Sequence, residues 1–361
     1  MRAALGTTML FVLILLPSIA TGQAPDSARL QSEDDFSRNV YLRQLLANAR
    51  QDMRRGDLAG AKAALRQALA LDERYKPARK ALIQLLLLQG PPREAEEQAQ
   101  IFARLYPEDT DSFFLRALVA FQNGRLPEAS ELAEACLKRG DRRGEIHKLL
   151  ALSAYLQGRL DEFETHIREA AKLDPLDPDP HYHLGRYYFE GKRYEQALGA
   201  FRKALELQPD HYKSHYYAGL VHEGQNNIEA AMREMRAAIQ IIERMKIKYA
   251  WPLADLGRLL VNDGDYDRGL GWLYRAIRND PESPYARYHY ARALFRQGAT
   301  IEVKQELTEA IKLDPGYSDA YYLLARYYQK TGEKNLAEET FAKFEEVKKN
   351  PPPSPYGVRR W

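Results

Sequence analysis

Tyrosine and arginine recur one helical turn apart in the C-terminal half of this 361-residue chain. Three pairs are spaced by four residues: Tyr182 and Arg186, Tyr288 and Arg292, and Tyr322 and Arg326. Residues four apart lie on one face of an α-helix. Arginine offers forked N–H donors to carboxylates and tyrosine offers rigid amphipathic contact area, so both are favoured where interfaces gain most affinity. This pattern predicts the binding of an extended, acidic protein segment.

Six further residues at equivalent or neighbouring positions extend this predicted binding face. They are Phe189, Tyr216, Trp251, Arg258, Tyr285 and Phe295. An alternative is that the arginines and tyrosines only cover the helices and pair with nearby carboxylates such as Asp179, Glu190 and Asp319. Exposed pairs of that kind contribute about 0–1 kcal/mol to stability, so they would imply no binding function.

A search for catalytic and metal-binding motifs finds no complete one in the sequence. His222 and Glu223 begin the zinc-protease motif HExxH, but Asn226 stands where the second histidine would be. There is no glycine-rich phosphate loop, no Gly-x-Ser-x-Gly and no Cys-x-x-Cys. Three histidines recur every 34 residues, at His147, His181 and His215. They could share a metal ion, but the position suits a packed ring with a polar edge, so we predict no enzyme, no cofactor and no metal site.

The helices that must position these residues are clearest in residues 181–210, HYHLGRYYFEGKRYEQALGAFRKALELQPD. This stretch predicts two amphipathic helices joined by a tight glycine-containing turn, with Gly185 on the buried face of the first and Ala197 and Ala204 on that of the second. Equivalent units begin near residues 42, 76, 110, 144, 178, 212, 250, 284 and 318. Small residues dominate the eighth, twentieth and twenty-seventh positions of these units, where the helices must nearly touch.

The 34-residue period and this set of residues resemble the tetratricopeptide repeat. The resemblance implies an all-α fold, a right-handed α-solenoid (superhelix) of about nine helix-turn-helix repeats over residues 42–351. It also implies that the first helix of each repeat lines a concave groove, which would contain the tyrosine and arginine side chains. Some tetratricopeptide domains carry a Lys/Asn clamp or an Asn ladder, but the sixth positions here are His183, Tyr217, Asp255, His289 and Leu323. The resemblance therefore implies no particular ligand.

Residues 1–24 have the plan of a secretory signal peptide: a charge at Arg2, an apolar core, and small residues that suit cleavage before residue 21 or 25. The alternative is an uncleaved anchor, although a membrane span needs about 20 predominantly apolar residues. The lone cysteine, Cys136, cannot form an intramolecular disulfide and is expected to be packed rather than reactive. We therefore predict a bacterial protein that is periplasmic or secreted, with membrane contact only through an uncleaved signal.

Three segments depart from the repeat pattern. Residues 25–41 are polar and aperiodic and are predicted to be a linker. The sixth repeat has four extra residues and runs on through IIERMKIKYAW, which predicts either a longer second helix or a local change of superhelical pitch that shapes a binding site. The proline-rich tail, residues 352–361, is predicted to be unstructured, with a ligand for a partner or a strap across the solenoid as alternatives.

The balance of charge excludes one class of partner. With 53 Lys and Arg against 50 Asp and Glu, the net charge is +3, which argues against nucleic-acid binding. The predicted function is an extracytoplasmic scaffold or adaptor that holds a protein segment in its groove, in envelope assembly or secretion. Two alternatives stay open: a polysaccharide-binding export scaffold, and a non-catalytic accessory subunit of an envelope enzyme.

Overall fold

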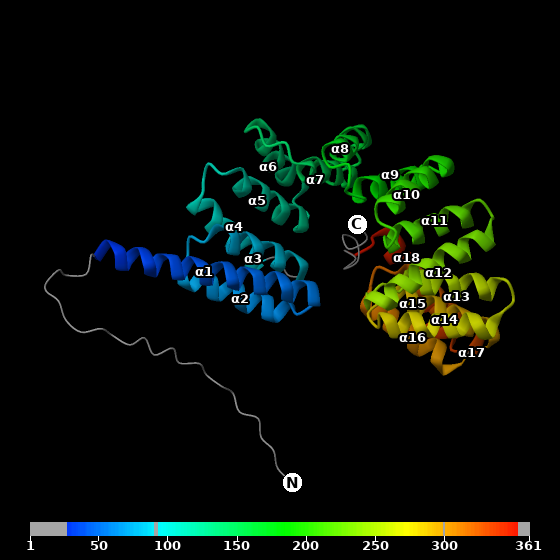
Figure 1. Cartoon of the computed structure of the whole chain (residues 1–361). Coiled ribbons are helices and arrows are strands. Elements are labelled where there is room, and N and C mark those ends of the chain that lie inside the picture. The colour runs from blue at the N-terminus through cyan, green and yellow to red at the C-terminus, as the bar shows by residue number, and fades with distance from the viewer. Residues whose placement is uncertain (1–26, 90–92, 299, 353–361) are drawn as a thin grey trace, which may run out of the picture. The chain divides into compact units, whose positions relative to one another are not determined.

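The computed structural model describes residues 27–89, 93–298 and 300–352, and every structural statement below refers to these residues. They form eighteen α-helices and no β-strand (Figure 1), arranged as nine successive pairs. The first helices of the pairs are α1 (Ser27–Arg55), α3 (Lys76–Gln89), α5 (Thr110–Gln122), α7 (Gly144–Leu156), α9 (Asp179–Glu190), α11 (Tyr212–Gly224), α13 (Trp251–Asn262), α15 (Pro284–Gln297) and α17 (Ser318–Thr331). The second helices are α2 (Leu58–Leu71), α4 (Arg93–Leu105), α6 (Leu126–Lys138), α8 (Leu160–Leu173), α10 (Tyr194–Leu207), α12 (Ile228–Met245), α14 (Tyr266–Asn279), α16 (Ile301–Leu313) and α18 (Lys334–Lys349).

These boundaries confirm the predicted repeat frame. From the second repeat on, each first helix begins at the predicted start or one residue after it. Proline follows several second helices by two residues, as Pro209 follows α10, because its ring cannot continue a helix. The turn after α9 differs in one detail: the left-handed backbone falls on Lys192, with φ of 55°, whereas Gly191 has φ of −76°.

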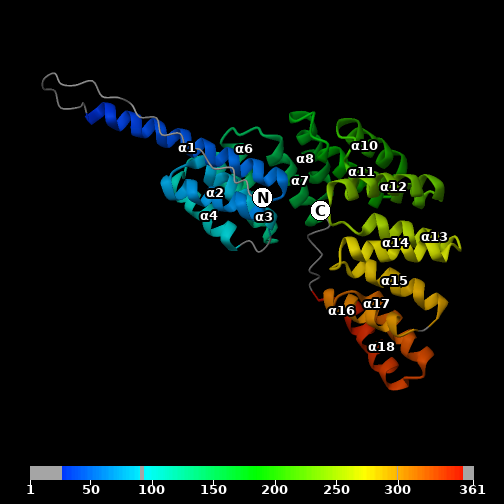
Figure 2. The same ribbon diagram turned by 60° about the horizontal axis from the view of Figure 1, so that its bottom comes forward.

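The chain divides into two compact units, with residues up to Leu85 in the first and residues from Leu86 on in the second. In the first unit, α1 packs against α2. In the second, each helix from α4 to α18 packs against the next one in chain order (Figure 2), and first helices of neighbouring repeats also meet, as α9 meets α11 and α13 meets α15. The second unit is therefore an α-solenoid of helix-turn-helix repeats.

Small side chains lie where the helices approach one another most closely. Ala117, Ala129 and Cys136 occupy the eighth, twentieth and twenty-seventh positions of one repeat, and all three are fully buried. Larger side chains such as Phe201, which is 1% exposed, fill the spaces between the helices. Buried clusters combine residues of neighbouring repeats, as one that contains Phe163 of α8, Phe201 of α10 and Val221 of α11, so stacked repeats bury cores that no single repeat could form alone.

The N-terminal end of the first repeat corrects one prediction. Helix α1 begins at Ser27, so residues 27–41 of the predicted linker continue the first helix of the repeat. No proline or glycine occurs between Pro25 and Gly56, so nothing in this stretch stops a helix. Phe36, Val40 and Tyr41 are 71%, 50% and 46% exposed, so residues 36–41 bury little apolar surface. A helix with little buried surface needs no apolar periodicity, which is why the pattern did not reveal it.

The four extra residues of the sixth repeat lengthen its second helix, as predicted. Helix α12 has 18 residues, whereas α10 and α14, the second helices of the neighbouring repeats, have 14 each. Ile241 and Ile242 are buried in the added turn. The chain leaves the helix at Lys246, whose backbone is left-handed with φ of 54°, and residues 247–250 connect it to α13.

Two predicted segments lie outside the described residues: the signal peptide over residues 1–24, and the tail from residue 353 on. Pro352, the first tail residue, reaches the turn between α16 and α17, where its carbonyl oxygen would lie 3.2 Å from a Cβ added to Gly316. Among the described helices, none has the length and apolar content needed to cross a membrane.

Candidate ligand-binding pocket

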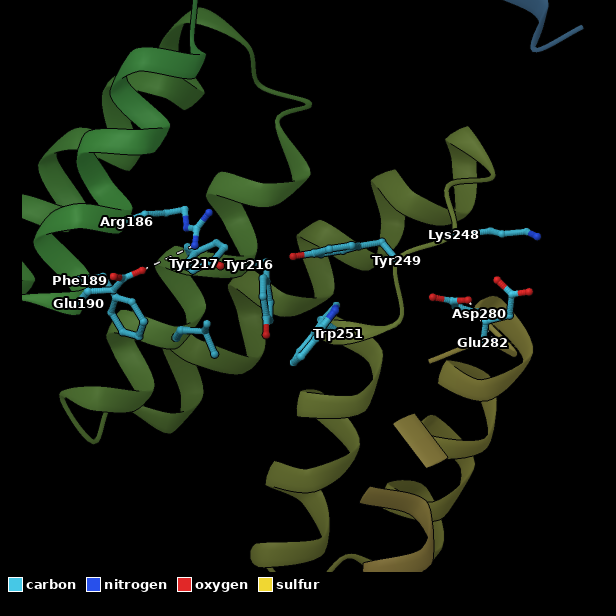
Figure 3. A pocket seen from close by; sticks show the side chains of 11 residues that line it. Arg186, Phe189, Glu190, Tyr216, Tyr217, Lys248, Tyr249, Trp251, Asp280 and Glu282 are labelled. Carbon is cyan, nitrogen blue, oxygen red and sulfur yellow. Dashed lines mark hydrogen bonds and ion pairs between the residues drawn. The ribbon is translucent and has the colours of Figure 1, made fainter. Parts of the chain in front are cut away.

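A pocket of about 510 Å³ opens where the fifth, sixth and seventh repeats meet (Figure 3). Its lining comes from α9, α11, the connector 247–250, the start of α13 and the loop that follows α14. The lining residues are Arg186, Phe189, Glu190, Tyr216, Tyr217, Leu220, Lys248, Tyr249, Trp251, Asp280 and Glu282. Such a volume falls within the range of roughly 300–1,000 Å³ that is usual for ligand sites.

The four-residue insertion creates one wall of this pocket. The added turn of α12 is followed by the connector 247–250, and Asn279 of α14 holds this connector at two points. The backbone N–H of Tyr249 donates to Asn279 Oδ1 at 2.8 Å, and Asn279 Nδ2 donates to the carbonyl oxygen of Ile247 at 2.9 Å. This pair of hydrogen bonds places Lys248 and Tyr249 at the pocket. The longer helix, one of the two alternatives from the sequence, is therefore confirmed, and the connector that follows it lines the pocket.

Five of the eleven lining residues are aromatic. The Tyr216 ring lies 5.3 Å from that of Tyr217 and 5.8 Å from that of Tyr249, measured between centroids. The rings of Phe189 and Tyr217 are nearly perpendicular, with their centroids 6.1 Å apart. Trp251 stacks on Tyr285 at 3.9 Å with an interplanar angle of 28°, so one face of the indole is covered from behind. Edge-to-face and stacked arrangements of this kind are favourable beyond the area that they bury.

A buried carboxylate fixes two of these walls. Asp255 of α13 is 1% exposed, and it accepts hydrogen bonds from the Tyr216 hydroxyl at 2.7 Å and the Tyr285 hydroxyl at 2.6 Å. Arg258 Nε donates to the same carboxylate at 2.9 Å, and its Nη2 donates to Glu223 at 2.7 Å. A buried charge is tolerated only with such partners. Because Tyr285 stacks on Trp251, Asp255 positions the tryptophan wall as well as the tyrosine wall.

The protonation state of the phenols suits this role. Burial, reinforced by the charge of Asp255, raises the pKa of Tyr216 and of Tyr285 well above its ordinary value. Burial likewise raises the pKa of Tyr249 well above its ordinary value. All three rings therefore stay uncharged at physiological pH, and Tyr216 and Tyr285 remain hydrogen-bond donors to the carboxylate.

The charged groups gather at two ends of the pocket (Figure 3). At one end, Arg186 lies 3.6 Å from Glu190, and its guanidinium sits 4.9 Å above the centroid of Tyr217. At the other end, Lys248 lies near Asp280 and Glu282, and the backbone N–H of Glu282 donates to the Asp280 carboxylate at 3.3 Å. The middle of the pocket is aromatic, so the site can hold a chain that is apolar in its centre and charged beyond it.

The structure brings together four of the predicted groove residues, which are Arg186, Phe189, Tyr216 and Trp251. Three others contact lining residues or their partners without lining the pocket. Tyr182 is 2% exposed, and its ring centroid lies 5.8 Å from that of Tyr217. Arg258 and Tyr285 donate hydrogen bonds to Asp255. The remaining five lie on α15 and α17, away from this pocket: Tyr288, Arg292, Phe295, Tyr322 and Arg326. Their role in binding stays a prediction.

Several lining residues were missed at the sequence level, notably Tyr217, Lys248, Tyr249, Asp280 and Glu282. The sequence analysis selected groove positions by their place in the first helix of a repeat. Four of the five lie in the connector or in the loop after α14, where that frame does not apply. The extra residues of the sixth repeat were the one available indication that the chain departs from the regular array at this point.

Other candidate sites have structural explanations. The Nδ1 atoms of His147 and His166 lie 3.0 Å apart, and His215 Nδ1 lies 2.7 Å from a Glu234 oxygen. In the part of the chain that the structure describes, no group of three or more potential ligands is placed to hold a metal ion. Cys136 is fully buried, and burial raises the pKa of its thiol to about 11. It is therefore a packed residue in the described fold, as the sequence predicted.

Comparison with known proteins agrees with this architecture. A model described as tetratricopeptide repeat matches residues 80–140, 114–178, 182–244 and 254–300, and a second model with the same description matches residues 306–339. The TPR repeat-containing thioredoxin TTL4 of Arabidopsis thaliana is 33% identical over 98 residues, which are 27% of this chain and 14% of that protein. This chain thus spans only a small part of that relative's length.

Solved structures give the same result at the level of the fold. The APC/C hetero-tetramer Cut9-Hcn1 superposes with a TM-score of 0.61 at 16% identity, over 78% of this chain and 55% of that chain. A monomeric mutant of IFIT1 with m7Gppp-AAAA superposes with a TM-score of 0.54 at 18% identity, over 83% of this chain and 80% of that chain. At such identities the likeness concerns the course of the backbone and carries no ligand with it.

Proposed function

This chain belongs to the tetratricopeptide-repeat family, and from that membership we propose that it is a scaffold whose aromatic pocket binds a segment of a partner protein. Arrays of this family generally act in protein–protein interaction and are non-catalytic, which supports a binding role without catalysis. Function resides in the site rather than in the fold, so the pocket must carry the specific part of the proposal.

The observation that carries the proposal is that contacts within the chain itself hold the pocket walls in place. Asp255 fixes Tyr216 directly and Trp251 through Tyr285, and Asn279 fixes the connector that bears Tyr249. A preorganised site avoids the loss of conformational freedom that a flexible surface would suffer on binding. Tyrosine and tryptophan are also the residues most often found at the energetic centres of protein interfaces.

We limit the predicted preference for acidic segments to the surface of α15 and α17. Arg186 and Arg258 already face carboxylates, at 3.6 Å from Glu190 and 2.9 Å from Asp255. Arg292 lies over the Tyr288 ring and Arg326 donates to the Tyr322 hydroxyl, and neither has a carboxylate partner among the described residues. These two arginines remain suited to acidic side chains of a segment that continues beyond the pocket.

We further propose that the chain works outside the cytoplasm, as a scaffold in envelope assembly or secretion. The plan of residues 1–24 supports this location. Sugars also stack on aromatic rings, so a polysaccharide is the alternative occupant. A glycan array incubated with the purified chain separates the two. If the chain retains a glycan only when Trp251 is present, and binds no peptide in that way, the polysaccharide is favoured.

Selection of random peptides on the purified chain tests the proposal. Trp251→Ala removes the stacked indole, and Trp272→Ala is the matched control, because Trp272 lies on α14 under Arg275 and does not line the pocket. Peptides retained by the wild type should bind the Trp272→Ala variant equally and the Trp251→Ala variant at least about ten-fold more weakly, which corresponds to 1.4 kcal/mol. If no selected peptide depends on Trp251, the pocket is not the binding site.

A further inference from the structure

A second site lies where the seventh and eighth repeats meet, between α13 and α15. We infer that a small cavity at this place binds a carboxylate group of the partner segment through the guanidinium groups of Arg292 and Arg296. This inference rests on the proposed function, because it presupposes that a protein segment lies along the array. It assigns a specific site within the broader preference of α15 and α17 for acidic side chains.

The cavity combines charged and apolar side chains. Its volume is about 10 Å³, close to the least that holds one water molecule, so it suits a single oxygen atom better than a whole side chain. Its lining includes Arg258, His289, Arg292 and Arg296, together with the buried Val261 and Leu273. Opposite charges attract more strongly beside such apolar surface than in open water.

Two of these arginines have no carboxylate partner among the described residues. The guanidinium of Arg292 lies 5.7 Å from the ring centroid of Tyr288, and Arg296 Nη1 donates to the amide oxygen of Asn262 at 2.9 Å. Both contacts leave the positive charge in place. Because the two arginines are four residues apart on one helix face, their charges repel each other. A carboxylate bound by both would replace this repulsion with charge-assisted hydrogen bonds.

The carboxylates nearby do not fill this role. Arg258 lies 2.9 Å from Asp255 and 2.7 Å from Glu223, so these two carboxylates are bound to it. Burial raises the pKa of Tyr288, and the charge of Asp319 adds to this effect. Within the described part of the chain, however, Asp319 forms no ion pair with an arginine of the cavity. Arg292 and Arg296 therefore remain the groups that can receive an added carboxylate.

The state of His289 agrees with a positive potential at this site. The residue is 7% exposed, and its Nδ1 has no hydrogen-bond partner among the described residues. Burial, reinforced by the charges of Arg292 and Arg258, lowers the pKa of His289 well below its ordinary value. The ring is therefore neutral at physiological pH, and the potential that disfavours its protonation favours an anion. A buried polar atom without a partner requires an explanation, and a carboxylate oxygen in the adjoining cavity supplies one.

The test uses the peptides that the purified chain retains from the random selection. We expect these peptides to share a carboxylate on an aspartate or glutamate. Replacing that residue with asparagine or glutamine should weaken binding about ten-fold in fluorescence anisotropy. Amidation of the peptide C-terminus separates the two sources of such a group, because a loss of affinity on amidation instead would show that the terminal carboxylate occupies the cavity.

Substitution of the two arginines supplies the complementary measurement. Arg292→Gln combined with Arg296→Gln should weaken the peptide that carries the carboxylate about ten-fold and leave its amide analogue unchanged. The control is Arg202→Gln combined with Arg278→Gln, which removes the same charge from exposed positions on α10 and α14 that do not line the cavity. This control should bind both peptides as the wild type does. Melting curves of both double variants show that each is folded.

The outcomes separate this inference from the proposed function. If the retained peptides share no carboxylate, or if the Arg292→Gln, Arg296→Gln variant loses no more affinity than the control, the carboxylate site is ruled out, while dependence on Trp251 would still support the proposed function. Peptides that depend on the two arginines but not on Trp251 would support the carboxylate site and exclude the aromatic pocket. If the chain retains no peptide, both proposals fail. Binding that depends on the carboxylate, on the two arginines and on Trp251 supports both.

Discussion

Replacing Gly257 with alanine should destabilise the seventh repeat, although alanine is the better helix former. Gly257 lies on α13 against α14, and an added Cβ would be 2.7 Å from Leu273 Cγ, 2.8 Å from the carbonyl oxygen of Gly269 and 3.0 Å from the backbone nitrogen of Leu273. Ordinary contacts begin at 3.4 Å. Because two of these neighbours are backbone atoms, rotation of a side chain cannot remove the clash, and the two helices must move apart.

The magnitude follows from two opposing effects. Alanine gains roughly 1 kcal/mol over glycine in a helix interior, whereas overpacking a core costs about 1–3 kcal/mol. Since backbone must move, we expect a cost near the upper end and a net loss of about 1–2 kcal/mol. Gly271→Ala is the matched control, because Gly271 is exposed inside α14 and its added Cβ would meet nothing within 4 Å. That variant should show the helix-propensity gain alone.

Urea denaturation followed by circular dichroism measures the free energy of unfolding of both variants. Hydrogen exchange over residues 251–279 adds local detail, because a repeat array can open in part. Gly257→Ala should lower the unfolding midpoint and speed exchange in α13 and α14, whereas Gly271→Ala should raise the midpoint. If both variants raise it alike, α13 and α14 do not pack through their backbones and the repeat frame is refuted.

Individual contacts predict three more outcomes. Asp255→Asn should cost roughly 1–3 kcal/mol of stability, because the carboxylate is buried against Arg258 and two tyrosines. Asp267→Asn is the control, because Asp267 is exposed and its replacement should leave the thermal midpoint unchanged. Equal midpoints for the two variants would mean that the network around Asp255 is not formed. Cys136 should resist iodoacetamide at mildly alkaline pH until the chain is denatured, because burial raises the pKa of its thiol to about 11. Fast labelling of the native chain would instead place the thiol at the surface. Mass spectrometry of the exported chain should find an N-terminus at residue 21 or 25, and an intact Met1 in the membrane fraction would indicate an anchored protein.

Helix positions were predictable because packing constrains residue size at short, fixed intervals. Ala117, Ala129 and Cys136 have to be small or compact where helices touch, so the 34-residue frame located the start of the first helix of each repeat from the second repeat on. The extension of α1 over residues 27–41 escaped this reasoning, because its exposed residues 36–41 are under no such constraint.

The candidate site was predictable only in part. Residues within the first helices, such as Tyr216 and Trp251, follow the frame and were found. Contacts between repeats decide which arginines can bind a ligand. Arg258, for example, lies 2.7 Å from Glu223 of the preceding repeat, and helix periodicity alone does not identify this partner. Tyr249 is placed by hydrogen bonds between the connector and Asn279, and no local pattern in the sequence encodes them.

The most direct test of the central claim is to follow the fluorescence of Trp251 during peptide binding. The chain has three tryptophans, so Trp272→Phe combined with Trp361→Phe leaves Trp251 as the single emitter. Titration with a selected peptide should change the emission of Trp251 in a saturable way, with the same Kd as fluorescence anisotropy of the labelled peptide. Binding that is clear by anisotropy while Trp251 emission stays constant would contradict the assignment of the pocket as the site that holds a partner segment.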